Sequence, residues 1–306
     1  PDLECEITGY SLWGVNEMYA TTLQKGRVFC GGDAIHRHPP SNGLGSNTSV
    51  QDSYNLAWKI ASVIKGHAGP GLLETYTAER APVAKQIVTR ANKSAREFAD
   101  IFAALGFDTA TSVEEMAEGV RRRKDNSPEG LATRKALTRA LELKDYEFNC
   151  HGVELGQFYA SSAVISDGST KPEPARDPEL YYEPSTVPGS PLPHAWVGDN
   201  VTKLSTLDLC PSKQFTLITG ITGEKWTEAA LAVAAKLEIP LEAVVIGPGR
   251  AVTDLYFDWE RLREIDEDGV VLVRPDKIIA WRSMSMVADP EQTLCDVLSQ
   301  MLDKAV

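Results

Sequence analysis

The stretch that decides the fold reads Gly31-Gly-Asp-Ala-Ile-His-Arg-His-Pro-Pro-Ser-Asn-Gly-Leu-Gly-Ser-Asn-Thr-Ser-Val-Gln-Asp52. In order, it contains a glycine turn, an acidic residue, a rigid proline corner and a glycine loop that leads into a helix. Glycines let a planar ligand approach the backbone closely, and free N–H groups at a helix start attract negative charge. An acidic residue behind a strand end, here Asp33, is placed to accept hydrogen bonds from a ribose hydroxyl. The stretch therefore predicts a nucleotide-binding loop.

Apolar residues on both sides of this loop predict short strands and a series of helices. Residues 26–31 are expected to form a buried strand that runs into the glycine turn, and residues 3–7 alternate like a weak strand. Apolar side chains at three- and four-residue steps predict an amphipathic helix over 48–65, with Ser49 and Asp52 resembling its capping box. Further helices are expected over 72–80, 83–105, 113–124 and 129–144, with Pro82 near the start of the second.

The chain changes character at a proline-rich segment. Seven prolines fall within residues 171–193, a density that excludes regular structure and is typical of a linker or a wrapping arm. Beyond it, the expected element order is β-α-β-α-β-β-α, which is the order of a thioredoxin-like domain. The expected strands are 214–219, 241–246, 269–274 and 277–281, and the expected helices are 225–237, 262–267 and 291–304.

Composition and charge narrow the classes of function. The 306 residues include 31 Lys and Arg against 43 Asp and Glu, a formal net charge of −12, which argues against nucleic-acid partners and anionic membrane surfaces. The sequence has no apolar run of the ~18–20 residues needed to span a bilayer. Its five cysteines form no Cys-x-x-Cys pair, so reduced thiols in a cytoplasm are expected, without a dithiol motif. His36 and His38 lack a clear third ligand, so no metal site is expected.

The motifs over residues 13–82 resemble those of one family. Asp33 within Gly32-Asp-Ala34, followed by His36, Pro39-Pro40, Gly43, Gly45 and Asn47, is similar to the second FAD fingerprint of the p-hydroxybenzoate hydroxylase family, the single-component flavoprotein aromatic monooxygenases. Near the end of the chain, Val271-Leu-Val-Arg-Pro-Asp276 and Ile279-Ala-Trp-Arg282 resemble the phenol hydroxylase branch, which carries a thioredoxin-like third domain. The other motifs that fit are Trp13-Gly-Val-Asn-Glu17, Gly26-Arg-Val-Phe29, Asp52-Ser-Tyr-Asn-Leu-Ala-Trp-Lys59 and Leu73-Glu-Thr-Tyr-Thr-Ala-Glu-Arg-Ala-Pro82.

The resemblance implies an α/β fold built from part of an FAD-binding domain and a whole thioredoxin-like domain. The FAD-binding part resembles the C-terminal portion of that domain in p-hydroxybenzoate hydroxylase, and it would occupy residues 1–170 together with a helical segment. The linker would occupy 171–193, and the thioredoxin-like domain, without Cys-x-x-Cys, 194–306. The sequence has no Gly-x-Gly-x-x-Gly, so the family's ADP-binding unit is expected upstream, in an N-terminal half that is either joined or a separate chain.

The resemblance also assigns roles to residues of the loop. Asp33 would hold the FAD ribose, and residues 34–40 would pass along the pyrophosphate and the flavin, with His36 orienting the loop and Pro40 beside the isoalloxazine. Backbone amides at the helix start would face N1 and O2 of the flavin, where a helix N-terminus stabilises the anion of reduced flavin by ~0.3–1 kcal/mol. The residues of this last group are Gly43, Gly45, Ser46 and Asn47.

The chemistry that the resemblance implies is ortho-hydroxylation of a phenol or chlorophenol to a catechol. NADPH would reduce FAD, and O2 would add to give a C4a-hydroperoxyflavin in a site that excludes water. The family's candidate bases lie upstream, so no catalytic residue is expected in this chain, and a homo-oligomer is expected. Two alternatives stay open: the same enzyme class acting on a polyketide or other aromatic, and a non-enzymatic thioredoxin-like assembly module.

Overall fold

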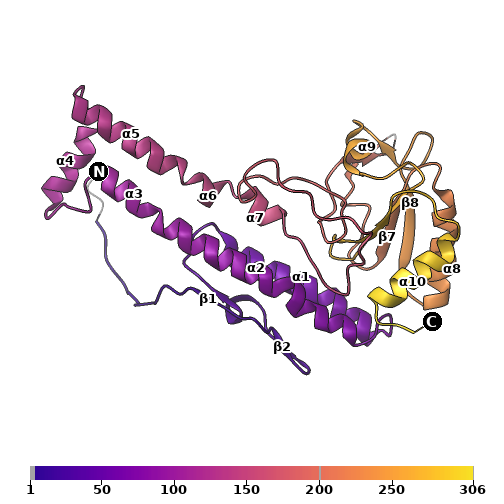
Figure 1. The fold of residues 1–306 in the computed structure, drawn as a ribbon. Helices are drawn as coiled ribbons and strands as arrows, with labels where there is room; N and C mark the ends of the chain where they lie inside the picture. Colours follow the sequence, from indigo (N-terminus) through magenta and orange to yellow (C-terminus); the bar gives the residue numbers. More distant parts are fainter. Residues whose placement is uncertain (1–3, 200, 306) are drawn as a thin grey trace.

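The structure, a computed structural model, describes residues 4–199 and 201–305. Two long helices, α1 and α2, pack against each other along the middle of the molecule, with a sheet-containing region at one end and a helical arm at the other (Figure 1). Side chains of Ser112 and Ser127 cap the first turns of the arm helices α4 and α5. The helices of this part are α1 Leu44–Ile64, α2 Gly71–Arg96, α3 Phe98–Ala104, α4 Val113–Arg122, α5 Pro128–Glu142, α6 Asp145–Phe148 and α7 His151–Leu155.

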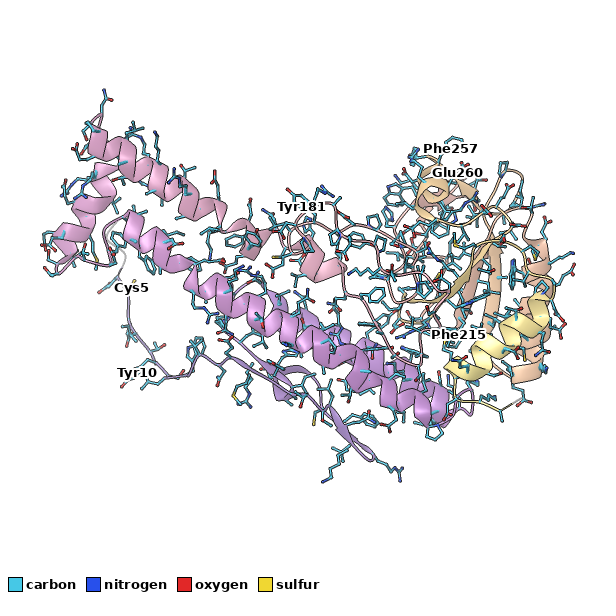
Figure 2. The ribbon with its side chains drawn as sticks, in the orientation of Figure 1. Cys5, Tyr10, Tyr181, Phe215, Phe257 and Glu260 are labelled. Carbon is cyan, nitrogen blue, oxygen red and sulfur yellow. The ribbon has the colours of Figure 1, made fainter. Side chains whose placement is uncertain are left out.

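Two short antiparallel strand pairs precede α1, where longer strands were expected. The prediction of one buried strand over 26–31 is confirmed only for Val28–Phe29, which is exposed or half-buried, because Gly26 (φ +57°) turns the chain between two paired two-residue strands. The prediction of a strand over 3–7 is wrong for residues 4–7, which are exposed and irregular; residue 3 lies outside the described residues. Cys5 and Tyr10 lie on this segment, which stands away from the helices (Figure 2). The elements are β1 Met18–Tyr19, β2 Gln24–Lys25, β3 Val28–Phe29, η1 Gly32–Ala34 and β4 His36–Arg37.

The central helices are longer than expected. The capping box at Ser49 is wrong: α1 starts at Leu44, four residues before the expected start at residue 48, and the Ser49 hydroxyl donates inside the helix to the Gly45 carbonyl at 2.9 Å. The boundary between the helices expected over 72–80 and 83–105 is misplaced. Helix α2 continues through Pro82 to Arg96, and α3 begins at Phe98. Pro82 is exposed, so the carbonyl that loses its helical partner faces water.

The C-terminal region contains the expected thioredoxin-like sheet, and the α/β fold class is confirmed. The sheet order is β11-β10-β7-β8, in which β7 and β8 are parallel and the other two pairs are antiparallel. The short helix expected over 262–267 is misplaced, since it occupies Asp258–Leu262, and a second sheet of order β6-β5-β9 was not expected. The elements are β5 Trp196–Gly198, β6 Lys203–Ser205, β7 Phe215–Thr219, α8 Glu224–Leu237, β8 Leu241–Val245, β9 Thr253–Asp254, α9 Asp258–Leu262, β10 Val270–Val273, β11 Ile279–Ser283 and α10 Pro290–Met301.

The two faces of the main sheet bury separate cores, as the alternation of side chains along a strand requires. On one face, Phe215 and Leu217 pack against α8 and α10, and Trp58 of α1 meets Phe215 edge-on with ring centroids 5.8 Å apart. On the other face, Ile218 and Val271 pack beneath the smaller sheet and α9. Because Trp58 belongs to the first core, the long helices and the C-terminal sheet share one apolar interior.

A cluster of buried charges joins α1, α2 and the C-terminal sheet. The Glu79 carboxylate accepts hydrogen bonds from Arg274 (2.7 and 2.9 Å), Lys59 (2.7 Å) and Asn55 (2.7 Å), and Arg274 also donates to Asp276 at 2.6 Å. All five side chains are buried. Burial lowers the pKa of Lys59 to about 8 although Glu79 opposes the shift. Burial raises the pKa of Glu79, but Arg274 and Lys59 outweigh it and hold that pKa far below its usual value.

The segment 171–193 contains no α-helix or β-strand, only an isolated bridge from Pro191 to Ile278. Its second half is largely buried: Leu192 N–H donates to the Lys277 carbonyl and Gly189 N–H to that of Ile279. The segment thus lies along β11, and the division at 170 and 193 stays a prediction. Across residues 4–199 and 201–305, every helix is too short or too polar to span a lipid bilayer.

Removing Arg274 should destabilise the fold strongly. In Arg274→Met, Glu79 and Asp276 stay buried with only Lys59 to balance them, and breaking a buried ion pair costs about 3–5 kcal/mol. The free energy of unfolding from urea denaturation measures the effect. The control is Arg121→Met, which removes an exposed pair with Glu118 and should change the stability by about 0–1 kcal/mol. Equal losses in the two variants would contradict a structural role for the buried cluster.

Candidate cofactor-binding site

Asp33 lies at the edge of an open cavity in front of α1. It is the middle residue of the one-turn helix η1, it is exposed, and its backbone carbonyl accepts a hydrogen bond from Arg37 Nε at 3.2 Å. The β1–β4 pair forms the rest of the wall, so both His36 and Asp33 belong to the same cavity. Its lining residues are Met18, Tyr19, Ala20, Asp33, Ala34, Ile35, His36 and Arg37.

The N-terminus of α1 is the second part of the site. Gly43 is its N-cap in a left-handed conformation (φ +62°), and a Cβ at that position would meet open space. The sequence predicted Gly45, Ser46 and Asn47 at the helix start, and the structure places all three inside the first turn, where Asn47 Nδ2 donates to the Gly43 carbonyl at 2.8 Å. The first turn holds no acidic side chain, so its backbone N–H groups keep their attraction for an anion. The expected Pro40 lies exposed just before it.

A buried carboxylate beneath the loop holds it in place. Asp52 Oδ2 accepts the Gly32 N–H at 3.0 Å and lies 3.2 Å from His36 Nε2, while Asp52 Oδ1 accepts from Arg80 Nε at 2.7 Å. Burial raises the pKa of Asp52, but the bonds from His36 and Arg80, the Arg80 charge and the Gly32 amide together lower it below its usual value. Arg80 Nη1 also donates to Gln157 and Tyr159, both at 2.8 Å. Asp52 is therefore an ionised anchor with three partners.

Sequence reasoning named the loop and missed this anchor. Asp52 was assigned to a capping box and Arg80 to a family motif, without a role in the site. The signal was present, because Asp52, Asn55 and Lys59 recur at steps of three and four and so lie on one side of α1. A charged stripe on a helix that also carries the buried Trp58 indicates buried ion pairs.

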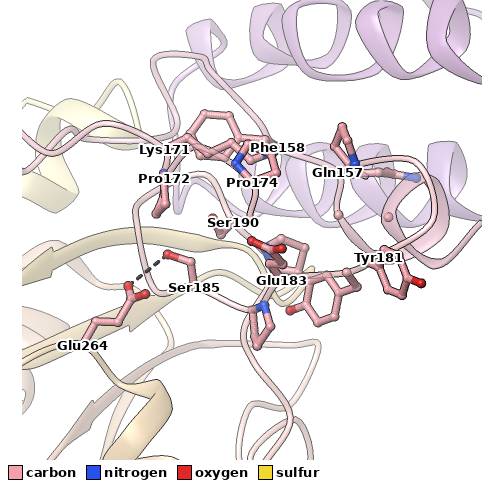
Figure 3. A pocket seen from close by; sticks show the side chains of 16 residues that line it. Gln157, Phe158, Lys171, Pro172, Pro174, Tyr181, Glu183, Ser185, Ser190 and Glu264 are labelled. Atoms are coloured by element: carbon pink, nitrogen blue, oxygen red, sulfur yellow. Dashed lines mark hydrogen bonds between the residues drawn. The ribbon is translucent and has the colours of Figure 1, made fainter. Parts of the chain in front are cut away.

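A second pocket, of about 160 Å³, lies between α7 and the proline-rich segment (Figure 3). Its two carboxylates are already engaged: Glu264 accepts from Ser185 at 2.9 Å and from Arg282 at 2.9 Å, and Glu183 accepts the backbone N–H groups of Ala175 and Arg176, both at 3.1 Å. No residue of the expected site lines this pocket. The η1 and α1 region is thus the better candidate.

The histidines and cysteines suggest no other chemistry in the described residues. The rings of His36 and His38 stack with centroids 6.0 Å apart, yet the described part of the chain contains no group of three or more His, Cys, Asp or Glu side chains that could hold a metal ion. All five cysteines are free thiols, with Cys150, Cys210 and Cys295 buried and Cys5 and Cys30 exposed. Burial raises the pKa of the Cys150 and Cys210 thiols to about 11, which keeps them unreactive.

The comparison with known families decides the assignment. Residues 1–91 match the FAD binding domain family, and residues 185–305 match the family described as aromatic-ring hydroxylase, C-terminal. The chain belongs to the flavoprotein aromatic hydroxylases. The predicted family is confirmed, and both matches fall where the loop and the thioredoxin-like sheet lie.

Individual relatives include enzymes named for phenols. The chain is 63% identical to a phenol 2-monooxygenase from a Pseudomonas strain over 97% of its own length and 49% of the relative. It is 51% identical to 2,4-dichlorophenol 6-monooxygenase from Cupriavidus pinatubonensis over 98% of the chain and 50% of the relative. The predicted resemblance to the phenol hydroxylase branch is confirmed by these two relatives. The chain spans about half the length of the curated relatives it matches.

Solved structures show the same fold. The flavin-dependent monooxygenase PieE, solved in complex with FAD and substrate, is 42% identical and superposes with a TM-score of 0.89 over 96% of this chain and 50% of PieE. An aklavinone-11 hydroxylase in a ternary complex with FAD and aklavinone is 33% identical, with a TM-score of 0.69 over 94% of this chain and 45% of its own.

The residues present fit FAD on three structural observations. Asp33 offers an exposed carboxylate beside a cavity, which suits ribose hydroxyls. The first turn of α1 offers backbone N–H groups without a competing carboxylate. His36 Nδ1 is buried and has no hydrogen-bond partner among the described residues, so the cavity wall keeps an unused polar atom. These three features are compatible with a ligand that carries ribose hydroxyls and an anionic group.

Acid should destabilise the fold partly through Asp52. Its pKa in the folded state is lower than the ordinary value of 3.8, so the folded state binds fewer protons than the unfolded one near that pH. The stabilisation is complete above about pH 4 and is lost as the pH falls through the folded-state pKa. Urea denaturation between pH 2 and 5 should show a less steep loss for Asp52→Asn than for wild type. Identical slopes would contradict the ionised anchor.

Proposed function

We propose that this chain forms the C-terminal half of an FAD- and NADPH-dependent monooxygenase that hydroxylates a phenol or chlorophenol at the ortho position to give a catechol. One observation carries the proposal. A segment that matches the FAD binding domain family contains both the exposed Asp33 and the N-terminus of α1, whose first turn has no acidic side chain. The 63% and 51% identity to phenol and dichlorophenol monooxygenases supports the substrate class. The C4a-hydroperoxyflavin route is part of the proposal.

The residues of this chain would bind and orient the cofactor. Asp33 accepts hydrogen bonds from the FAD ribose, and His36 and Pro40 define the path of the loop beside the pyrophosphate and the flavin. N–H groups at the start of α1, from Gly43 through Gly45 and Ser46 to Asn47, would face N1 and O2 of the flavin and would favour negative charge there. Bound FAD supplies the activation of O2, and electrons come from NADPH. The exclusion of water and any proton transfer would require the site formed together with the N-terminal half.

The proposal also includes the partners. The phenolic substrate and O2 meet at the flavin, and an N-terminal half supplies the ADP-binding unit, either within one polypeptide or as a separate chain. Without that half, this chain alone is expected to be inactive. We further expect a homo-oligomer in the cytoplasm.

Flavin binding tests the role of Asp33. In the complete flavoprotein, Asp33→Ala should raise the dissociation constant for FAD at least tenfold, because a charge-assisted hydrogen bond of about 1.5–3 kcal/mol is lost. The measurement is quenching of flavin fluorescence during titration of the apoprotein. The control is Glu228→Ala, which removes an exposed carboxylate from α8 and should leave the affinity unchanged. Unaltered affinity in Asp33→Ala would refute the ribose role.

Product analysis tests the reaction. The complete protein should oxidise NADPH in the presence of phenol or 2,4-dichlorophenol, and the product should be the corresponding catechol. Turnover of a polycyclic aromatic polyketide with no turnover of phenols would instead favour the polyketide alternative, to which a putative polyketide hydroxylase of Streptomyces halstedii, 34% identical, is the relevant relative. A protein that binds no FAD and oxidises no NADPH would favour the non-enzymatic assembly module.

A further inference from the structure

The η1 turn that carries Asp33 is held by a side chain that never reaches the cavity. Asp52 lies two helical turns into α1, and 1% of its side chain is exposed. It does not line the cavity in front of α1, whereas Asp33 and His36 do. Asp52 therefore acts on a ligand only through other residues.

Its contacts reach both sides of Asp33. One oxygen, Oδ2, accepts the N–H of Gly32, the residue just before Asp33, and lies 3.2 Å from Nε2 of His36, three residues after it. The turn and the following strand are thus tied to one atom of α1. Asp33, whose own side chain is exposed, therefore lies between two residues that contact the same carboxylate oxygen.

The hydrogen bond from the Gly32 N–H to Asp52 matters because the η1 turn packs closely on α1. Gly32 has a φ of +62°, and a Cβ there would lie 2.9 Å from the Ser49 hydroxyl oxygen. A left-handed residue packed this closely on α1 stays in place when its N–H is hydrogen bonded. That bond is the one to Asp52.

The second carboxylate oxygen is held from α2. Arg80 Nε donates to Oδ1 at 2.7 Å, and the Arg80 guanidinium continues to Gln157 and Tyr159. With both oxygens bonded, the carboxylate has one orientation. Through Asp52, the η1 turn that carries Asp33 is thus connected to both α1 and α2.

We propose that Asp52 is a positioning residue for FAD, which holds Asp33 in its ribose-binding orientation through the Gly32 amide and the His36 imidazole. This inference rests on the proposed function and deepens it. It assigns to a buried residue of α1 a part of the affinity for the cofactor. The rival explanation is that Asp52 only stabilises the fold.

A matched pair of variants separates the two explanations. Asp52→Asn keeps the shape but removes the charge, and Asp167→Asn makes the same change at another buried carboxylate, which is paired with Arg282 at 2.6 Å away from the loop. Both variants should lower the thermal midpoint of the apoprotein. In the complete flavoprotein, Asp52→Asn should raise the FAD dissociation constant at least tenfold, and Asp167→Asn should leave it within twofold of wild type. Equal effects of the two variants on FAD affinity would overturn the proposal.

A double-mutant cycle tests the route through Asp33. If Asp52 acts by orienting Asp33, Asp52→Asn should add less than twofold to the FAD dissociation constant of Asp33→Ala, whereas independent effects would multiply. Multiplied effects would overturn the proposal. Should Asp52→Asn fail to fold, His36→Asn decides, since it breaks the imidazole tie and leaves the Arg80 pair intact; it should weaken FAD binding at least fivefold, and unchanged affinity would count against the proposal.

The outcomes for the positioning role and for the proposed function are distinct. A tenfold loss in Asp33→Ala with an unchanged Asp52→Asn would leave the ribose role standing and remove only the positioning role. Unchanged affinity in Asp33→Ala would remove the ribose role itself, and the positioning role with it.

Discussion

The structure depends on charges that are buried together and balanced. Glu79 of α2 receives Arg274 from the C-terminal sheet and Lys59 from α1, and Asp276 completes the set. Each of these groups alone would be costly away from water, and each is tolerated because its partners are fixed at hydrogen-bonding distance. The cluster thus connects two neighbouring helices to a region 195 residues further along the chain from Glu79. The apolar contact of Trp58 with Phe215 also connects α1 to the C-terminal sheet.

Helix α1 connects the charge cluster to the candidate site. Its first turn presents backbone N–H groups around Gly45, and its third turn places Asp52 beneath the η1 turn. Further along the helix, Asn55 and Lys59 belong to the charge cluster. Because one rigid helix bears all three, the cofactor loop and the C-terminal sheet share a common frame. The C-terminal region is thus connected to the candidate site through α1.

Local patterns were sufficient where the chemistry is local. The thioredoxin-like order, the helix bounds of α5 and α8 and the placement of the loop before α1 follow from periodicity and glycine positions. Errors arose where distant contacts outweigh local preference. Within the predicted strand 26–31, only Val28–Phe29 is a strand, and it pairs back on Gln24–Lys25 around Gly26. Helix α2 passes through Pro82 because that position faces water and α2 is packed along α1. The smaller sheet was missed because its strands of two or three residues carry too little periodicity to detect.

The sequence alone was enough for the family, the class of cofactor and the position of the candidate loop, because the glycines, Asp33 and the proline corner are contiguous in the chain. Only the tertiary structure revealed what holds that loop. Asp52 and Arg80 come from different helices, and Glu79 and Arg274 lie 195 positions apart, so no local pattern indicates that they touch. Buried ion pairs are chosen by three-dimensional proximity and by the need to neutralise charge away from water, and these conditions exist only once the chain has folded.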